Sequence, residues 1–208
     1  MTAIWGPLGW MTLHSVATSY PEVPSPAEKQ LVSTWLDMFR DTITCPYCKD
    51  HFTDMLAAYR RQYPNMLDSR QSFTVATFRM HNSVNRRLNK PIYNTVEECM
   101  STLKNNIKNR SAQDYRISYN NHIMRFWRTQ QDTAGIVTLK KVLEMKKIEI
   151  EYIQYRDTKF DVTIHPDIVV LPSDVMTLKK EQVKTAPRIG NVPKVGLVLG
   201  PGGFRLRK

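Results

Sequence analysis

The chain has 208 residues, of which 41% are hydrophobic and 24% charged, with a net charge of +11 and 3 cysteines. This hydrophobic content is sufficient for a folded core, and the length allows one domain with an extension or two small domains. No run of 18 apolar residues occurs, so no membrane span is expected. Three cysteines exclude a disulfide framework. Residues 1–5 lack a basic segment leading into an apolar run, so we expect no signal peptide.

The charge is distributed unevenly along the chain. Residues 1–102 contain 10 Lys/Arg and 9 Asp/Glu, a net of +1, whereas residues 103–208 contain 20 and 10, a net of +10. A basic second half indicates an acidic protein, a nucleic acid or an anionic surface as partner. Because the charges are scattered rather than grouped, an ordinary solvated surface explains them as well.

The first helix is predicted within residues 5–20, because Pro7 suits a helix start and Pro21 stops one. Residues at helical spacing form one apolar stripe along it: Trp10, Leu13, His14 and Ala17. A Trp and a His in such a stripe are usually core residues, although they could face a flat aromatic cofactor.

Two capping boxes, at residues 25–28 and 95–98, mark the starts of two more helices. In all we expect four helices after the first, over residues 26–42, over residues 46–62, from Ser69 or Ser72 to Leu88, and over residues 96–108. Each of these five helices is too short to be stable alone. They must pack together, so the predicted fold class is all-α.

The third of these helices opens with a pair of cysteines, Cys45 and Cys48, with Pro46 at the first helical position. Residues three apart on a helix are neighbours, so the two thiols can form a disulfide. The helix N-terminus favours a thiolate and lowers its pKa. This pattern favours a redox pair, but a structural disulfide or half of a zinc site also fits. A zinc site would need further ligands, and the candidates are His51 and Cys99.

The fourth helix contains a polar group of residues within an otherwise mixed sequence. His81, Asn82 and Asn85 lie at helical spacing, so one face presents an imidazole and two carboxamides. Asn is a poor helix former, so the presence of two Asn residues within this helix calls for an explanation. The group either binds a ligand rich in donors and acceptors or forms a solvent-facing stripe.

Three motifs in this order carry a family resemblance. They are Trp5-Gly6-Pro7 with Trp10, His14, Tyr20 and Pro21; Cys45 and Cys48 with His51 and Phe52; and His81-Asn82 with Val84, Asn85, Leu88, Lys90 and Pro91. Together, over about residues 5–100, they resemble the FAD-dependent sulfhydryl oxidases of the Erv/ALR family. The resemblance implies a four-helix bundle with a short fifth helix and FAD in the mouth of the bundle.

The resemblance also implies a site. Cys45 and Cys48 would be catalytic, no residue would bind metal, and Lys90 would be the phosphate partner. The FAD-binding residues would be Trp5, Gly6, Trp10, His14, Tyr20, Cys48, His81, Asn82, Val84, Asn85, Leu88 and Lys90. Protein dithiols would be oxidised at Cys45, Cys48 would face the flavin, and dioxygen would be reduced to hydrogen peroxide. His51 would tune the thiolate or simply pack. The family's members are commonly homodimers.

The sequence departs from the cellular pattern of the family in three ways. A disulfide that often brackets the His-Asn helix would fall on Phe78 and Thr95, so it is missing. Cys99 alone cannot form an intrachain shuttle disulfide. A long basic extension follows the motifs. The two losses resemble the minimal versions encoded by large DNA viruses, which implies the host cytoplasm or the virion as location.

Beyond the family motifs we expect three regions: an oxidase domain over residues 1–108, a helical extension over 109–156 and an extended basic tail over 157–208. The extension should contain a helix from about Ser111 to Gln130 and another from about residue 134 to 155, although the alternation in residues 148–153 could equally be a strand. The Pro- and Gly-containing tail could dock on a viral or other protein assembly, or be disordered.

Two other functions compete with the oxidase. A thioredoxin-like protein without flavin would need its Cys-x-x-Cys in a βαβ unit, and the flanking segments are predicted to be helical. The alternative is a structural or virion-associated scaffold whose basic tail is its main function, with oxidase activity secondary. The intact cysteine pair and FAD motifs favour the oxidase.

Overall fold

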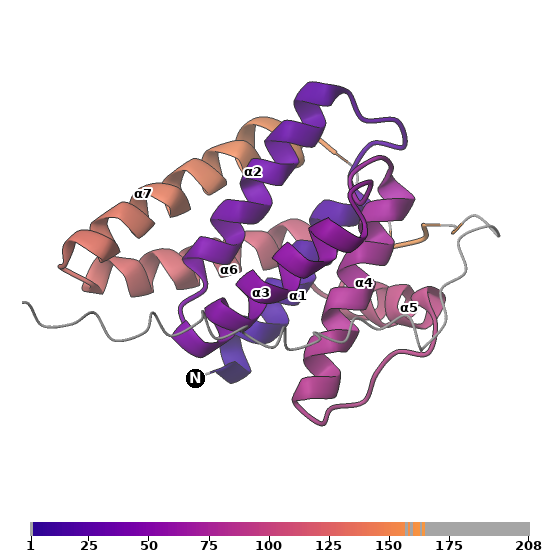
Figure 1. Ribbon diagram of the computed structural model, residues 1–208, viewed down its shortest axis with the longest axis horizontal. Helices are drawn as coiled ribbons and strands as arrows, with labels where there is room; N and C mark the ends of the chain where they lie inside the picture. Colours follow the sequence, from indigo (N-terminus) through magenta and orange to yellow (C-terminus); the bar gives the residue numbers. More distant parts are fainter. Residues whose placement is uncertain (1, 157, 159, 163, 165–208) are drawn as a thin grey trace, which may run out of the picture. The chain divides into compact units, whose positions relative to one another are not determined.

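The computed structural model describes residues 2–156, 158, 160–162 and 164. Within them lie seven α-helices and one π-helical turn, and no strand (Figure 1), so the all-α prediction is confirmed. The elements are α1 (Thr2–Thr18), α2 (Pro26–Thr42), α3 (Pro46–Gln62), α4 (Arg70–Arg87), α5 (Val96–Asn106), α6 (Ala112–Thr129), α7 (Thr133–Ile148) and the π-helical turn η1 (Glu149–Ile153).

Side-chain caps explain where the helices begin. Ser25 and Glu28 form the predicted capping box of α2, each side chain accepting a hydrogen bond from the backbone N–H of the other residue. The hydroxyl of Ser69 accepts from the backbone N–H of Ser72, so Ser69 is the cap of α4. Thr95 caps α5 in the same way. These bonds satisfy N–H groups that have no partner inside the helix.

The second half of helix α1 is buried on every side. The helix begins at Thr2 rather than at Pro7, which lies inside it. All side chains of residues 11–20 are buried, because α1 packs against both α4 and α6. The hydroxyls of Ser15 and Thr18 bond to carbonyl groups one turn back, which satisfies them in this apolar environment. From residue 11 onwards, the predicted stripe is therefore only part of a helical segment that is buried all round.

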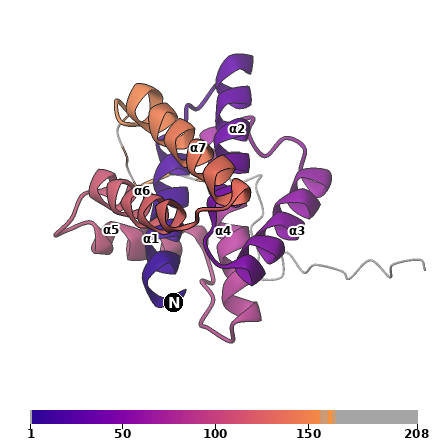
Figure 2. The same ribbon diagram turned by 90° about the vertical axis from the view of Figure 1, so that its left-hand side faces the viewer.

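The helical extension packs onto the first helices. Figures 1 and 2 both show α6 beside α1 and α7 beside α2. The ring of Tyr119 on α6 stacks on Phe39 of α2 with centroids 5.0 Å apart. The indole of Trp127 donates a hydrogen bond of 2.8 Å to the carbonyl of Thr42. The extension thus shares one hydrophobic core with α1, α2 and α3, while the proposed boundary at residue 108 stays a prediction.

The strand considered for residues 148–153 is wrong, because this segment continues α7 as a π-helical turn. Glu149 and Ile153, four residues apart, are both buried. Residues at this spacing share one face of a helix, so both point into the core. The carboxylate of Glu149 accepts hydrogen bonds from Trp35 Nε1 at 3.3 Å and from Asn120 Nδ2 at 2.6 Å. These hydrogen bonds come from residues far away in the sequence, and they favour a helical turn here over the strand that the local alternation also allowed.

No helix within the described part of the chain is long and apolar enough to cross a membrane. The predicted basic tail over residues 157–208 falls almost entirely outside the described residues. Of its first residues, Phe160 is buried in a second hydrophobic cluster with residues of α4 and α5.

Candidate active site

A cavity of about 660 Å³ opens between α1, α3 and α4. Its volume lies in the range of small-molecule and cofactor sites. Most residues of the predicted FAD-binding set line it: Trp5, Gly6, Trp10, Cys48, His81, Val84, Asn85, Leu88 and Lys90. Three of the predicted residues, His14, Tyr20 and Asn82, do not line it.

The cysteine pair lies at the edge of this cavity. Cys45 and Cys48 form a disulfide, with their Cα atoms 5.2 Å apart. Cys45 is the N-cap of α3, and its sulfur accepts the backbone N–H of Cys48 at 3.3 Å. Both residues are half-buried, but only Cys48 lines the cavity. The disulfide thus joins a residue that lines the cavity to one that does not, which favours a redox role over a purely structural one.

His81 and Trp10 form an aromatic wall of the cavity. Their rings stack with centroids 4.2 Å apart and planes 9° from parallel. The ring of Tyr93, in the loop after α4, meets His81 edge-on at 5.4 Å. All three residues line the cavity. Such a wall suits a flat ring system, which can stack on its aromatic faces.

His14 lies behind this wall, fully buried. Its Nε2 is 3.0 Å from Nδ1 of His81, a hydrogen bond in which one ring donates and the other accepts. Burial lowers the pKa of His14 to about 3. Burial, followed by the charges of His14 and Lys90, holds the pKa of His81 well below its usual value. Both imidazoles are therefore neutral near pH 7.

The solvent-facing interpretation of the polar group on α4 is wrong, because Asn82 and Asn85 are buried. Asn82 holds the loop that carries Tyr93: its Nδ2 donates to the carbonyl of Tyr93, and its Oδ1 accepts the N–H of Tyr93, both at 2.9 Å. Asn82 therefore positions a wall of the cavity without lining it. Tyr20 is buried elsewhere, with its hydroxyl donating to the carbonyl of Leu67 at 3.0 Å.

The end of α4 determines the place of Lys90. Asn89 adopts a left-handed conformation with φ 52°, which Asn tolerates better than most residues. The N–H of Lys90 donates to the carbonyl of Asn85 at 2.9 Å, and the N–H of Asn89 to that of Arg86 at 3.1 Å. This Schellman motif ends the helix. It leaves Lys90 exposed and lining the cavity, as a phosphate partner would be.

Sequence reasoning missed Arg87 as a cavity residue. Its guanidinium lies over the ring of Tyr47, 5.0 Å from the centroid, next to the cysteine pair. Arg87 lines the cavity together with His51, for which the sequence analysis left the role open. Burial lowers the pKa of His51, and the positive charge of Arg87 lowers it further. The cavity is also lined by Pro7, Leu13 and Phe52, which belong to the predicted stripe or motifs but were given no binding role. The remaining lining residues had no sequence signal: Gly9, Met11, Phe39, Ile43, Tyr93, Leu103 and Asn106.

The residues of the cavity fit FAD. The wall of Trp10 and His81 offers stacking faces for a planar ring system. Two buried donors on lining residues, Nε1 of Trp5 and Nε of Arg87, have no hydrogen-bond partner within the described part of the chain. Together with Lys90 they provide donors and positive charge for the polar and phosphate groups of such a cofactor.

Comparisons with known proteins agree with this arrangement. The model of the Erv1 / Alr family matches residues 8–109. An FAD-linked sulfhydryl oxidase of African swine fever virus (isolate Tick/Malawi/Lil 20-1/1983) is 34% identical over 93 residues, which cover 45% of this chain and 75% of the viral protein. The chain belongs to the Erv1/Alr family. The resemblance inferred from the three motifs is thereby confirmed.

Other members of the Erv1/Alr family match the same part of the chain. A putative FAD-linked sulfhydryl oxidase, 347L, of Invertebrate iridescent virus 6 is 34% identical over 92 residues, 43% of this chain and 83% of that protein. The FAD-linked sulfhydryl oxidase ERV2 of Saccharomyces cerevisiae is 27% identical over 88 residues, 42% of this chain and 43% of that protein. No solved structure matches the chain significantly.

Proposed function

We propose that this protein is a thiol oxidase that uses FAD to form disulfide bonds in protein substrates. One observation carries the proposal: the Cys45–Cys48 disulfide has Cys48 in the wall of an aromatic-lined cavity and Cys45 outside it. Membership of the Erv1/Alr family supports the same function. The acceptor of the electrons is dioxygen, and the product is hydrogen peroxide.

The two cysteines divide the exchange reaction between them. A substrate thiolate attacks Cys45, the Cys45–Cys48 bond breaks, and Cys48 leaves as a thiolate. A second substrate thiolate attacks the mixed disulfide and releases Cys45, so the substrate is oxidised and the pair is reduced. Negative charge on Cys45 is stabilised by the N–H of Cys48 and by the N-terminus of α3.

The pair then returns to the disulfide. When bound, FAD supplies a two-electron acceptor that dioxygen can reoxidise. Because Cys48 lines the cavity, it would be the cysteine that passes the two electrons to bound FAD as the Cys45–Cys48 bond forms again. His51 lies one turn from Cys48, and burial favours its neutral ring, which can accept a thiol proton. The residues that would hold FAD are Trp5, Gly6, Trp10, His81, Val84, Asn85, Leu88 and Lys90, with His14 and Asn82 supporting the wall.

The test combines flavin content with oxygen consumption. Purified protein supplemented with FAD should show flavin absorbance and consume oxygen with a small dithiol. Cys45→Ser and Cys48→Ser should each retain flavin but abolish oxygen consumption, because neither can form the disulfide. Thr44→Ser, one residue before the pair, is the matched control and should remain active. A protein without flavin absorbance, or full turnover in either cysteine variant, would reject the proposal.

Several finer points are proposals of the same kind. The protein is a homodimer in the host cytoplasm or the virion, and the basic segment over residues 157–208 docks it on an acidic surface of a protein assembly. Support for docking comes from the composition of residues 157–208, which contain 9 Lys/Arg and 5 Asp/Glu and so carry a net charge of +4. A chain ending at residue 164 should keep FAD and dithiol oxidation but no longer co-sediment with the assembly. Unchanged co-sedimentation would exclude the docking role.

A further inference from the structure

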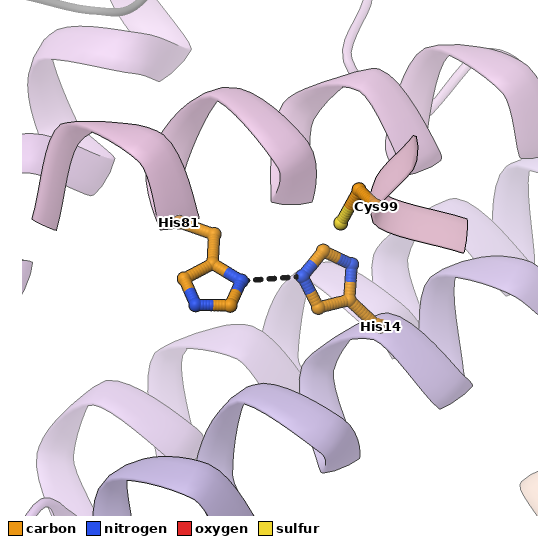
Figure 3. Close-up of side chains that lie close together, drawn as sticks. All are labelled: His14, His81 and Cys99. Carbon is orange, nitrogen blue, oxygen red and sulfur yellow. Dashed lines mark hydrogen bonds between the residues drawn. The ribbon is translucent and has the colours of Figure 1, made fainter. Parts of the chain in front are cut away.

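A buried group of two histidines and a cysteine lies behind the aromatic wall (Figure 3). His14 comes from α1, His81 from α4 and Cys99 from α5. Each offers one ligand atom, a ring nitrogen or the sulfur, and these three atoms lie within 4.8 Å of one another. Cys99 is fully buried and takes no part in a disulfide. The proposed oxidase reaction does not use this thiol.

The protein alone does not satisfy this group. Nδ1 of His14 is buried and has no hydrogen-bond partner, although the ring bonds to His81 through its other nitrogen. Figure 3 shows the His14 ring between His81 and Cys99, with Nδ1 on the side of the sulfur. Because Nδ1 is not the nitrogen that faces His81, it can carry the hydrogen of the His14 ring when Nε2 uses its lone pair to bind a ligand.

The chemistry and spacing of the group suit a metal such as zinc. Imidazole nitrogen and thiolate sulfur are its preferred ligands, and three protein ligands leave one position open. With ordinary bond lengths, tetrahedral zinc would hold two nitrogens about 3.3 Å apart and a nitrogen and a sulfur about 3.6 Å apart. The facing nitrogens of His14 and His81 are 3.0 Å apart, so the rings need to separate only slightly.

We propose that His14, His81 and Cys99 form a binding site for a divalent transition metal, with zinc as its best-suited occupant. On binding, the thiol of Cys99 loses its proton to solvent and forms the metal–sulfur bond. The hydrogen shared by the two rings moves to an outer ring nitrogen, so that each histidine offers a lone pair. Because His81 also lines the cavity, the open fourth position lies next to the wall of the proposed flavin site.

Zinc binding to the full-length oxidised protein tests this proposal. With Cys45 and Cys48 joined as a disulfide, Cys99 is the one remaining thiol of the 3 cysteines. Equilibrium dialysis with metal analysis should give one tightly held zinc per chain. Cys99→Ser should weaken binding by about a hundredfold or more, because a serine hydroxyl is a poor zinc ligand. Met100→Leu, at the adjacent buried position of α5, is the matched control and should bind like the wild type.

Cobalt provides a second, spectroscopic readout. Co²⁺ added to the FAD-loaded oxidised protein should give intense tetrahedral bands at wavelengths beyond the flavin absorption, and zinc should remove them. If Cys99→Ser fails to fold, the Cys45→Ser/Cys48→Ser double variant, in which Cys99 is the remaining cysteine, should still give the bands. Weak octahedral bands in the wild type, or equal zinc affinity in Cys99→Ser, would mean that the metal binds adventitiously elsewhere and would overturn the proposal.

Discussion

Trp10 of α1 and His81 of α4 stack face to face, with ring centroids 4.2 Å apart. The pair joins the first and fourth helices and forms one wall of the cavity in which we place FAD. Residues from two of the family motifs thus form a single surface. The wall has consequences for both cofactor affinity and fold stability.

Trp10→Ala should lower the affinity for FAD by about tenfold or more, because it removes a stacking face worth about 1 kcal/mol beyond its buried area. Trp10→Phe should lose less, since it keeps an aromatic ring. Trp127→Phe removes an indole outside the cavity and should leave FAD affinity unchanged. Fluorescence titration of the flavin-free protein measures all three. Equal affinity in Trp10→Ala and the wild type would remove Trp10 from the flavin site.

Asn82→Ala should destabilise the fold by about 2 kcal/mol, because it leaves the N–H and the carbonyl of Tyr93 without their partners. Asn105→Ala, on the exposed surface of α5, is the control and should change stability by less than about 0.5 kcal/mol. Urea denaturation gives both values. An Asn82→Ala protein as stable as the control would show that the Tyr93 loop does not depend on this side chain.

The buried carboxyl group of Glu149 should make the free energy of unfolding depend on pH. Burial raises its pKa from 4.5 to about 7, against the opposing effects of Arg116 and of the hydrogen bonds from Asn120 and Trp35. Between about pH 4.5 and 7 the folded protein holds a proton that the unfolded chain releases. This contribution to stability is therefore fully present below about pH 4.5 and is lost as the pH rises towards 7.

Glu149→Gln should remove this dependence. At pH 8 the wild type must bury a charged carboxylate, whereas the amide of the variant is neutral. The variant should therefore be more stable than the wild type at this pH, by about 1–3 kcal/mol. At pH 5 the gain should be smaller. The unpartnered Oδ1 of Asn120 can accept from the new amide if Asn120 turns over. Urea denaturation at both pH values checks this, and a difference between variant and wild type that is the same at pH 5 and pH 8 would contradict it.

Truncated chains should show how much the helical extension over residues 109–156 and the following segment each contribute to the stability of the fold. A chain ending at residue 110 lacks α6 and α7 and exposes Phe39 and Trp35, which are buried in the full chain. We expect it to lose cooperative thermal unfolding. A chain ending at residue 164 should unfold cooperatively, whereas one ending at 156 also lacks Phe160 and should be less stable by about 2 kcal/mol. Cooperative unfolding of the shortest chain would show that the extension is dispensable for the core.

The sequence alone determined the helices and the cysteine pair, because both depend on neighbouring residues. Ser25, Ser69 and Thr95 cap helices within three residues of themselves, and Cys45 and Cys48 meet across one turn. Such contacts are local, so spacing predicts them. Most of the FAD-binding residues that the family motifs predicted then line the cavity.

The tertiary structure decided what depends on contacts between distant segments. Only packing against both α4 and α6 shows that the second half of α1 is buried all round, and only the loop after α4 gives Asn82 its partner in Tyr93. The alternation near Glu149 fitted a helix and a strand equally well, but Trp35 and Asn120 stabilise a helical turn there. His14, His81 and Cys99 likewise meet only because three helices converge. Periodicity records which residues share a face of one helix, whereas burial and polar partners depend on what lies opposite that face.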